Sequence, residues 1–256
     1  MAANSNFQLT VIIPAYNEAR YISGAVSTLA AYLRERFNTF EIIVVDDGSR
    51  DGTGNVVKSQ ELHLPIGCAI QVLINEQNSG KGYSTRRGAL ASQGDVILFM
   101  DADLSYDLEG IEQITRSIQQ GADLAIGSRL VEGAQIQSGV PMVRSLTGRA
   151  FNLLVQLLLF KGVPDTQCGI KGFAHKAAQD LFSLLTVRTF GFDVELLYIA
   201  RLRGYRIEQI PVKLVNYRNE SRVSVWRDSW RMFRDVIKVR WQGMRGLYAL
   251  QPGKAG

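Results

Sequence analysis

Apolar residues follow two alternating patterns over the first half of the chain. Short apolar runs, typical of buried strands, alternate with longer segments in which apolar residues recur every three or four positions, as in amphipathic helices. The predicted strands cover 9–17, 40–49, 69–75, 95–103 and 122–129, and the predicted helices cover 18–37, a segment beginning near 51, 80–93 and 108–121. This alternation predicts an α/β fold with a mostly parallel central sheet and right-handed crossovers.

The pattern changes after residue 129. A polar, glycine-containing loop is expected over 131–141, and an apolar helix over 144–161. Further helices near 175–186 and 192–203, a strand at 205–212 and a last helix at about 224–244 follow. Because no internal repeat or low-complexity linker divides the chain, we expect one domain over 1–223, followed by a basic amphipathic helix and tail over 224–256.

Two of the predicted strands end on aspartates: Asp46 and Asp47 end one, and Asp101 and Asp103 end the other. Burying unpaired carboxylates is costly, so these groups should emerge at the carboxyl edge of the sheet, where α/β sheets bind ligands. Asp101 and Asp103 can hold a divalent cation that bridges phosphate oxygens, although Asp residues also cap solvated turns. The cation interpretation predicts an enzyme that acts on a phosphate-bearing substrate.

Composition narrows the setting. Two cysteines 100 positions apart give no disulfide framework, which suits a reducing compartment. No apolar run reaches the roughly 18–20 residues that span a bilayer, and the first residues do not resemble a signal peptide. The net charge of +5 is concentrated in residues 201–256, which carry 13 Lys/Arg against 4 Asp/Glu. This basic end indicates an anionic partner: membrane lipid, substrate phosphates or nucleic acid.

The segment 224–244 combines an aromatic stripe with cations. The stripe consists of Trp226, Trp230, Phe233, Ile237 and Trp241, and the cations one position behind are Arg227, Arg231, Arg234 and Lys238. Such a helix either packs on the core through its aromatic stripe or lies in the plane of an anionic membrane surface. Nucleic acid is not an expected partner, because the tail lacks a known nucleic-acid-binding motif and would leave the aspartates unexplained.

Several motifs, taken in order, resemble those of a known family. They begin with Pro14-Ala15-Tyr16-Asn17-Glu18, the Asp46-Asp47 cluster and Asp101-Ala102-Asp103, which resemble an inverting family 2 glycosyltransferase of the GT-A fold. Further motifs at 127–129, 165–169, 192–195 and 218–222 are similar to those of the polyprenyl-phosphate hexose synthases, which make dolichyl-phosphate mannose or glucose. Segments 78–82 and 167–171 are closer to the glucose branch.

This resemblance implies that a hexose moves from a nucleotide diphosphate sugar to a polyprenyl phosphate with inversion. It favours UDP-glucose as the donor, leaves GDP-mannose open, and implies Mg²⁺ or Mn²⁺ on Asp101 and Asp103. The implied nucleotide-sugar site is Pro14, Tyr16, Glu18, Asp47, Lys81, Asp101, Ala102, Arg218 and Arg222; the implied acceptor-phosphate site is Arg129 and Arg144; and the implied catalytic residues are Asp103, Arg129, Asp193 and Glu195.

An alternative is a soluble family 2 transferase that uses a sugar or a small hydroxyl acceptor. Such an acceptor needs a general base, for which Asp193, Glu195 or Asp165 are candidates. A lipid monophosphate is already anionic and needs none. Many relatives in this family carry transmembrane helices, which this sequence lacks. We therefore expect a cytoplasmic protein that is associated peripherally with the cytoplasmic face of a membrane.

Overall fold

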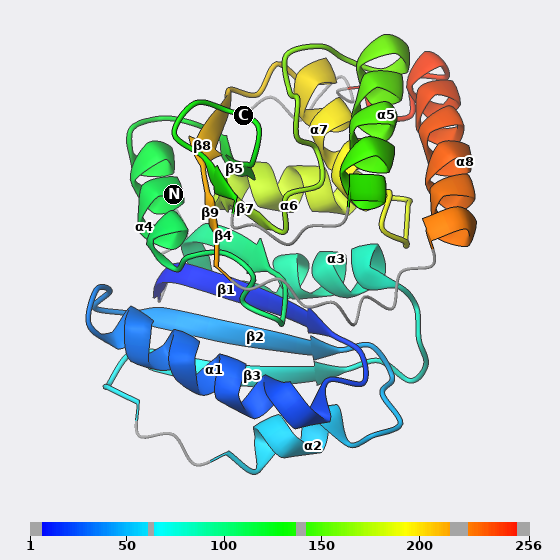
Figure 1. Ribbon diagram of the computed structural model, residues 1–256. Coiled ribbons are helices and arrows are strands. Elements are labelled where there is room, and N and C mark those ends of the chain that lie inside the picture. Colours follow the sequence, from blue (N-terminus) through cyan, green and yellow to red (C-terminus); the bar gives the residue numbers. More distant parts are fainter. Residues whose placement is uncertain (1–6, 61–63, 137–141, 216–224, 250–256) are drawn as a thin grey trace.

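The computed structural model describes residues 7–60, 64–136, 142–215 and 225–249, with only the backbone for 142–147, 149–150 and 225–229. Its main element is a seven-stranded sheet in the order β3-β2-β1-β4-β7-β5-β8, covered by helices on both faces (Figure 1). The strands are β1 Phe7–Ala15, β2 Phe40–Asp46, β3 Cys68–Ile74, β4 Gly94–Met100, β5 Leu124–Ser128, β7 Ile170–Ala174 and β8 Ile207–Pro211. All pairings are parallel except those of β7, so the predicted mostly parallel α/β sheet is confirmed.

The helices agree with most of the sequence prediction. They are α1 Ala19–Arg34, α2 Thr53–Lys58, α3 Lys81–Ala91, α4 Glu109–Gln119, α5 Met142–Leu158, α6 His175–Leu184, α7 Phe192–Leu202 and α8 Val225–Met244. The expected loop at 131–141 instead contains a short strand, β6 Gln135–Ile136, which pairs in parallel with β9 Lys213–Leu214. Both strands are only two residues long, too short to show any hydrophobic period.

Strand β7 was not expected from the sequence. It lies between β4 and β5, antiparallel to both, although it is one of the later strands along the chain. Its sequence, Ile170-Lys-Gly-Phe-Ala, contains a lysine and a glycine and so lacks the apolar run that marks the other central strands. A Cβ on Gly172 would collide with Ile114 of α4, so glycine is what lets α4 pack this closely on the strand.

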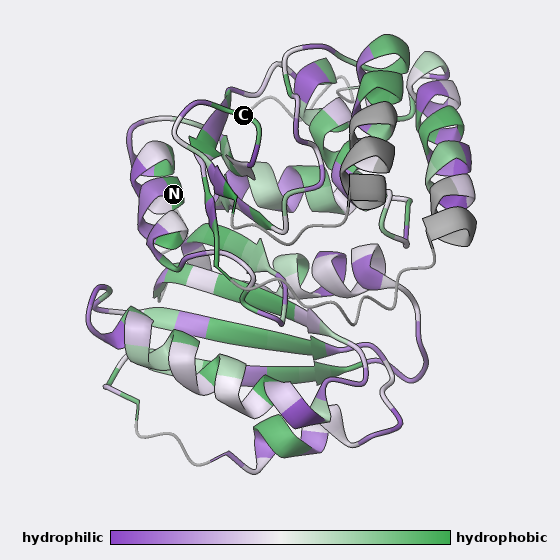
Figure 2. Ribbon diagram, viewed as in Figure 1, coloured by the Kyte–Doolittle hydropathy of each residue, from purple (hydrophilic) through white to green (hydrophobic). Residues whose placement is uncertain are grey.

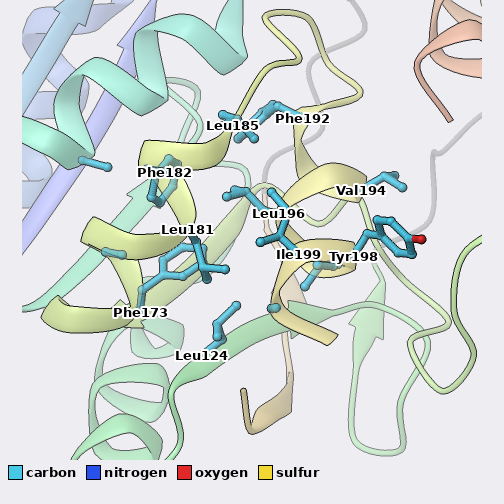
Figure 3. Close-up of a cluster of buried hydrophobic side chains, with 14 of the residues drawn as sticks. Leu124, Phe173, Leu181, Phe182, Leu185, Phe192, Val194, Leu196, Tyr198 and Ile199 are labelled. Atoms are coloured by element: carbon cyan, nitrogen blue, oxygen red, sulfur yellow. The ribbon is translucent and has the colours of Figure 1, made fainter. Parts of the chain in front are cut away.

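The sheet separates two hydrophobic cores, because alternate strand residues face opposite sides. On β1, Ile12 joins the core beneath α3, α6 and α7, whereas Val11 and Ile13 join the core beneath α1 and α4. The first core is rich in aromatic rings, with Phe173 edge-on to Phe182 at 5.3 Å between centroids (Figure 3). Burial on both faces explains the mainly hydrophobic colouring of β2 and β4 (Figure 2).

Helix α8 is part of the first core. Val236 and Val239 are buried in it, and so is Tyr248, which follows the helix. The division of the chain at residue 223 stays a prediction, but the core extends across it. Among the described residues, no helix combines the length and apolar character needed to cross a bilayer.

Candidate active site

The predicted site residues of the first half gather at one edge of the sheet. Strand β1 lies between β2 and β4, and all three run parallel, so their carboxyl ends are neighbours. The backbone N–H of Asp47 donates to the carbonyl of Ala15 at 2.8 Å, which joins the ends of β2 and β1. The loop after β1 is fixed to the one after β2, since Glu18 N–H donates to Thr53 Oγ1 at 2.8 Å. Pro14, Tyr16 and Glu18 therefore lie beside Asp47.

Asp47 organises the segment that leads into α3. Its buried carboxylate accepts hydrogen bonds from Asn75 Nδ2 at 2.8 Å and from the backbone N–H groups of Ser79 at 2.9 Å and Gly80 at 2.8 Å. A carboxylate has further lone pairs, so these bonds leave it able to accept from a ligand. Asn75 was not expected from the sequence: it is a single amide at the end of β3, without a motif to mark it.

Asp46 has a different set of partners. It accepts from the N–H groups of Ser49 and Gly54, both at 2.9 Å, so it shapes the turn between β2 and α2.

Lys81, the first residue of α3, is paired with Asp101 at the end of β4. The distance from Lys81 Nζ to Asp101 Oδ1 is 2.5 Å, and both side chains are partly exposed, at 18% and 35%. Burial opposes the charge on Lys81, but the carboxylates of Asp101, Asp193 and Asp103 outweigh it and raise the lysine pKa above its usual value. The ammonium is therefore held in the charged form by a cluster of acidic groups.

Two glycines allow this pair to form. Gly80 has a positive φ of 99°, and a Cβ there would collide with the carbonyl of Arg188. That carbonyl also accepts from Gly82 N–H at 2.8 Å, which fixes the first turn of α3. A Cβ on Gly169 would overlap the Asp101 carboxylate, and the Gly169 carbonyl accepts from Asp101 N–H at 3.1 Å. Any larger residue at 169 would displace Asp101.

Asp103 follows Asp101 on the same loop, and its Oδ1 accepts from Ser105 N–H at 3.1 Å. Ala102 between them is buried. Within the described residues, no group of three or more His, Cys, Asp or Glu side chains could hold a metal ion. Two carboxylates nevertheless suit a cation such as Mg²⁺, which commonly binds one or two protein carboxylates and completes its coordination with water and substrate phosphates. The donor set of Asp101 and Asp103 therefore fits the implied metal.

A second lysine–aspartate pair is buried behind the first. Lys171 Nζ on β7 donates to Asp193 Oδ1 on α7 at 2.6 Å and to the Cys168 carbonyl at 2.7 Å, and Lys171 is fully buried. Burial raises the pKa of Asp193, against the opposing effect of the Lys171 and Lys81 charges. The importance of Lys171 was missed, because only the fold shows that it neutralises Asp193.

Arg129, at the end of β5, is fixed by a fully buried carboxylate. Its Nε and Nη2 donate to the two oxygens of Asp165 at 2.7 and 2.8 Å, and its backbone N–H donates to Oδ2 at 2.9 Å. Burial opposes the charge of Arg129, but Asp165 outweighs it and raises the pKa of the guanidinium. Burial also raises the pKa of the neighbouring Cys168 to about 11, so this thiol stays protonated at neutral pH.

Glu195 has hydrogen-bond partners different from those of the groups described above. Its carboxylate accepts from Thr186 Oγ1 at 2.7 Å, Val187 N–H at 2.7 Å and Tyr248 OH at 2.6 Å. These bonds tie the loop after α6 to the segment after α8. The structure places Arg144 on α5 by its backbone alone, and Arg218 and Arg222 lie outside the described residues.

Comparison with known proteins identifies the family. The model of the family "Glycosyl transferase family 2" matches residues 10–182, which is more than half of the chain. The chain belongs to glycosyl transferase family 2. The match includes every cluster described above up to β7, and the clusters formed by Asp193 and Glu195 lie beyond it.

Curated relatives of this glycosyltransferase cover nearly its whole length. Dolichyl-phosphate beta-glucosyltransferase of Homo sapiens is 34% identical over 256 residues, which cover 95% of this chain and 78% of the relative. The enzyme of the same name from Dictyostelium discoideum is 32% identical, over 96% of this chain and 78% of the relative. The resemblance to the glucose branch of this family is therefore confirmed.

Solved structures support the fold of this glycosyltransferase. Glucosyl-3-phosphoglycerate synthase from Mycobacterium tuberculosis, in complex with Mn²⁺, UDP-glucose and phosphoglyceric acid, superposes with a TM-score of 0.69 at 20% identity, over 92% of this chain and 80% of that one. Mannosyl-3-phosphoglycerate synthase from Rubrobacter xylanophilus gives a TM-score of 0.68, also at 20% identity, over 96% and 78% of the two chains. The predicted GT-A fold is confirmed.

Proposed function

We propose that this glycosyltransferase transfers glucose from UDP-glucose to a polyprenyl phosphate, with inversion at the anomeric carbon. The relatives' names support glucose as the sugar and a dolichyl-type phosphate as the acceptor. Mg²⁺ or Mn²⁺ on Asp101 and Asp103 would supply Lewis-acid stabilisation of the leaving diphosphate. Asp47, Pro14, Tyr16, Glu18 and Lys81 would bind the nucleotide-sugar, together with Arg218 and Arg222.

The observation that carries this proposal concerns the three candidate general bases. Asp193 is buried and paired with Lys171, Asp165 is held by both arms of Arg129, and Glu195 accepts from several donors. A base needs a carboxylate that can reach a substrate hydroxyl and take its proton. All three are already engaged, which favours an acceptor that needs positioning and charge screening rather than deprotonation. A phosphate monoester is such an acceptor.

Arg129 and Arg144 would bind the acceptor phosphate. Asp165 leaves part of the Arg129 guanidinium unused, and the side chain is 35% exposed. The remaining N–H groups suit phosphate oxygens, because the planar guanidinium fork matches their spacing. Glu195 instead has the contacts of a structural group, and we assign it a positioning role for the loop after α6.

A membrane-facing surface would bring the enzyme to a lipid acceptor. Helices α5 and α8 lie side by side (Figure 1) and expose large apolar side chains. These are Leu153 and Leu157 on α5 and Trp230, Phe233, Ile237, Trp241 and Met244 on α8. Helix α8 packs on the core through Val236 and Val239, so its described aromatic residues are not the packing stripe. Exposed aromatics beside Arg231, Arg234 and Lys238 suit an anionic lipid surface.

A donor and acceptor screen tests the proposal. Purified protein is incubated with Mn²⁺ or Mg²⁺ and radiolabelled UDP-glucose or GDP-mannose, in the presence of a short polyprenyl phosphate, the matching polyprenol or free sugars. We expect transfer from UDP-glucose to the polyprenyl phosphate, with a β-linked product. Transfer to the hydroxyl acceptors, with none to the phosphate, would support the alternative of a soluble transferase.

A further inference from the structure

The pair formed by Lys81 and Asp101 has a consequence for metal binding. Lys81 Nζ lies 2.5 Å from Asp101 Oδ1, so the ammonium directly holds one oxygen of a carboxylate that would ligate the cation. A divalent cation and an ammonium group compete for the same carboxylate charge. Binding of the cation at this oxygen therefore includes the cost of breaking the charge-assisted hydrogen bond.

We propose that Lys81 serves as the counter-ion of Asp101 when the site is empty. When the donor diphosphate binds, the Lys81 ammonium pairs with the diphosphate instead, and the Asp101 carboxylate becomes available to the divalent cation. This inference rests on the proposed function, because it concerns the same donor site. It makes the binding of metal and of nucleotide mutually dependent, with Lys81 as the positioning residue that links them.

The charges around Lys81 favour this exchange. Asp101, Asp103 and Asp193 contribute three carboxylates that act on the Lys81 ammonium, and Lys171 contributes a second ammonium behind them. A divalent cation added alone would turn this nearly balanced cluster positive while displacing Lys81. A nucleotide diphosphate restores the balance, so metal should bind weakly alone and tightly together with the nucleotide.

Asp193 is a poor alternative partner for the displaced lysine. Its Oδ1 is already 2.6 Å from the Nζ of Lys171, which is fully buried. A diphosphate, in contrast, would approach the N-terminal end of the 11-residue helix α3, where Lys81 is the first residue. The positive end of the helix dipole at this point also favours an anion. The diphosphate is therefore the recipient that the geometry favours.

Linkage makes the inference measurable. If nucleotide raises metal affinity by some factor, metal raises nucleotide affinity by the same factor. Replacing Lys81 by methionine keeps an unbranched side chain of similar length, one atom shorter, and removes its charge. This substitution should tighten metal binding in the absence of nucleotide, and it should reduce the factor by which metal and nucleotide raise each other's affinity. A lysine that merely binds the donor would weaken nucleotide binding without any gain in metal affinity.

The test measures Mn²⁺ binding by electron paramagnetic resonance and by calorimetry, with and without UDP. In the wild type, UDP should tighten Mn²⁺ binding strongly. In Lys81→Met, Mn²⁺ alone should bind about tenfold or more tightly, the low end for a hydrogen bond to a charged group, and the enhancement by UDP should fall by a similar factor. Lys81→Gln should behave in the same way, and Lys81→Arg should stay close to the wild type.

A matched control is Lys176→Met, which removes an exposed lysine from the first turn of α6 and should leave both affinities unchanged. Absence of any UDP enhancement in the wild type overturns the inference, whether or not the variants fold. The inference is also overturned if the Lys81→Met or Lys81→Gln variant binds Mn²⁺ no more tightly than the wild type does. Because the readout is binding, a protein that shows this pattern but transfers no glucose would uphold the exchange and reject the proposed function.

Discussion

The guanidinium of Arg129 grips the buried carboxylate of Asp165 with two parallel hydrogen bonds, of 2.7 and 2.8 Å. Asp165→Asn removes the charge but nearly keeps the shape. We expect the acceptor KM to rise while nucleotide affinity is unchanged, because Arg129 would no longer be held in place for the phosphate. The free energy of unfolding should fall by about 3 kcal/mol, the scale of breaking a buried pair. Urea denaturation and steady-state kinetics measure the two effects.

A second Arg–Asp pair offers the control for this change. Arg203, just after α7, donates from Nη1 to Oδ1 of Asp180 on α6 at 2.5 Å. Asp180→Asn should lower stability without changing the acceptor KM. If Asp165→Asn likewise affects stability alone, Asp165 has no positioning role.

The same carboxyl predicts a pH dependence of stability. Burial opposes ionisation of Asp165, but the hydrogen bonds and charge of Arg129 outweigh it and lower the pKa of this carboxyl below its usual range. A carboxyl with a lowered pKa in the folded state stabilises the protein above its unfolded pKa of about 3.9, and this contribution is lost as the pH falls through the folded value. The stability difference between wild type and Asp165→Asn should therefore be constant near neutrality and shrink below about pH 4. A difference that grows towards acid pH would contradict the assignment.

Removing the metal should abolish most activity. Asp103→Asn takes away one of two proposed ligands, so turnover should fall by about two orders of magnitude or more, the scale of losing a main electrostatic stabiliser. EDTA should have the same effect, reversed by Mn²⁺. Ser105→Ala is the control, because it keeps the backbone N–H that donates to Asp103. Full turnover in EDTA would exclude a metal role for these carboxylates.

Arg144→Ala tests the acceptor site independently of Asp165. Loss of one charge-assisted contact to phosphate costs about 1.5–3 kcal/mol, so kcat/KM for the acceptor should fall by roughly 10- to 150-fold. Titration calorimetry with UDP should give the wild-type affinity. A variant that loses nucleotide affinity instead would place Arg144 in the donor site.

Membrane binding should depend on the cations of α8. Replacing Arg231, Arg234 and Lys238 by Gln removes about 1 kcal/mol of lipid attraction per charge, so co-sedimentation with anionic liposomes should weaken by roughly 100-fold. Activity on a long-chain acceptor in such liposomes should fall with it. Activity on a short, water-soluble polyprenyl phosphate should remain, because these side chains belong to α8, whereas the aspartates of the site follow β2 and β4.

The control for the membrane experiment removes three exposed cations elsewhere: Lys58 on α2, Arg116 on α4 and Lys176 on α6, each changed to Gln. This variant has the same net charge as the α8 variant and should bind anionic liposomes like the wild type. Equal loss in both variants would show a general charge effect, and a wild type that binds neither anionic nor neutral liposomes would favour the soluble-acceptor alternative.

Sequence patterns predict the elements whose signal is local. Strands β2 and β4 are buried on both faces, and their apolar runs and terminal aspartates mark both the sheet and its functional edge. Strand β7 could not be predicted in this way, because Lys171 interrupts the apolar pattern. Its buried charge is compensated by the Cys168 carbonyl and by Asp193 of α7, which is remote in sequence. The pairing of Lys81 with Asp101 is likewise a product of the fold. Both residues were predicted for the donor site, but the sequence around each of them gives no sign that the two side chains form an ion pair.

The position of β7 also shapes how the chain must fold. Strand β4 pairs with β1 on one side. Its neighbour on the other side, β7, follows α5 in the chain and is therefore synthesised later. Until then, β4 presents an unpaired, strongly apolar edge of the kind that invites aggregation. The sheet becomes continuous only when a late segment inserts between β4 and β5 and pairs with both. Insertion of a strand from so far along the chain is slow, because the entropy of loop closure is lost before the stabilising contacts form. This insertion also places Lys171 where Asp193 of α7 pairs with it, so the charged cluster depends on β7 having taken its place in the sheet.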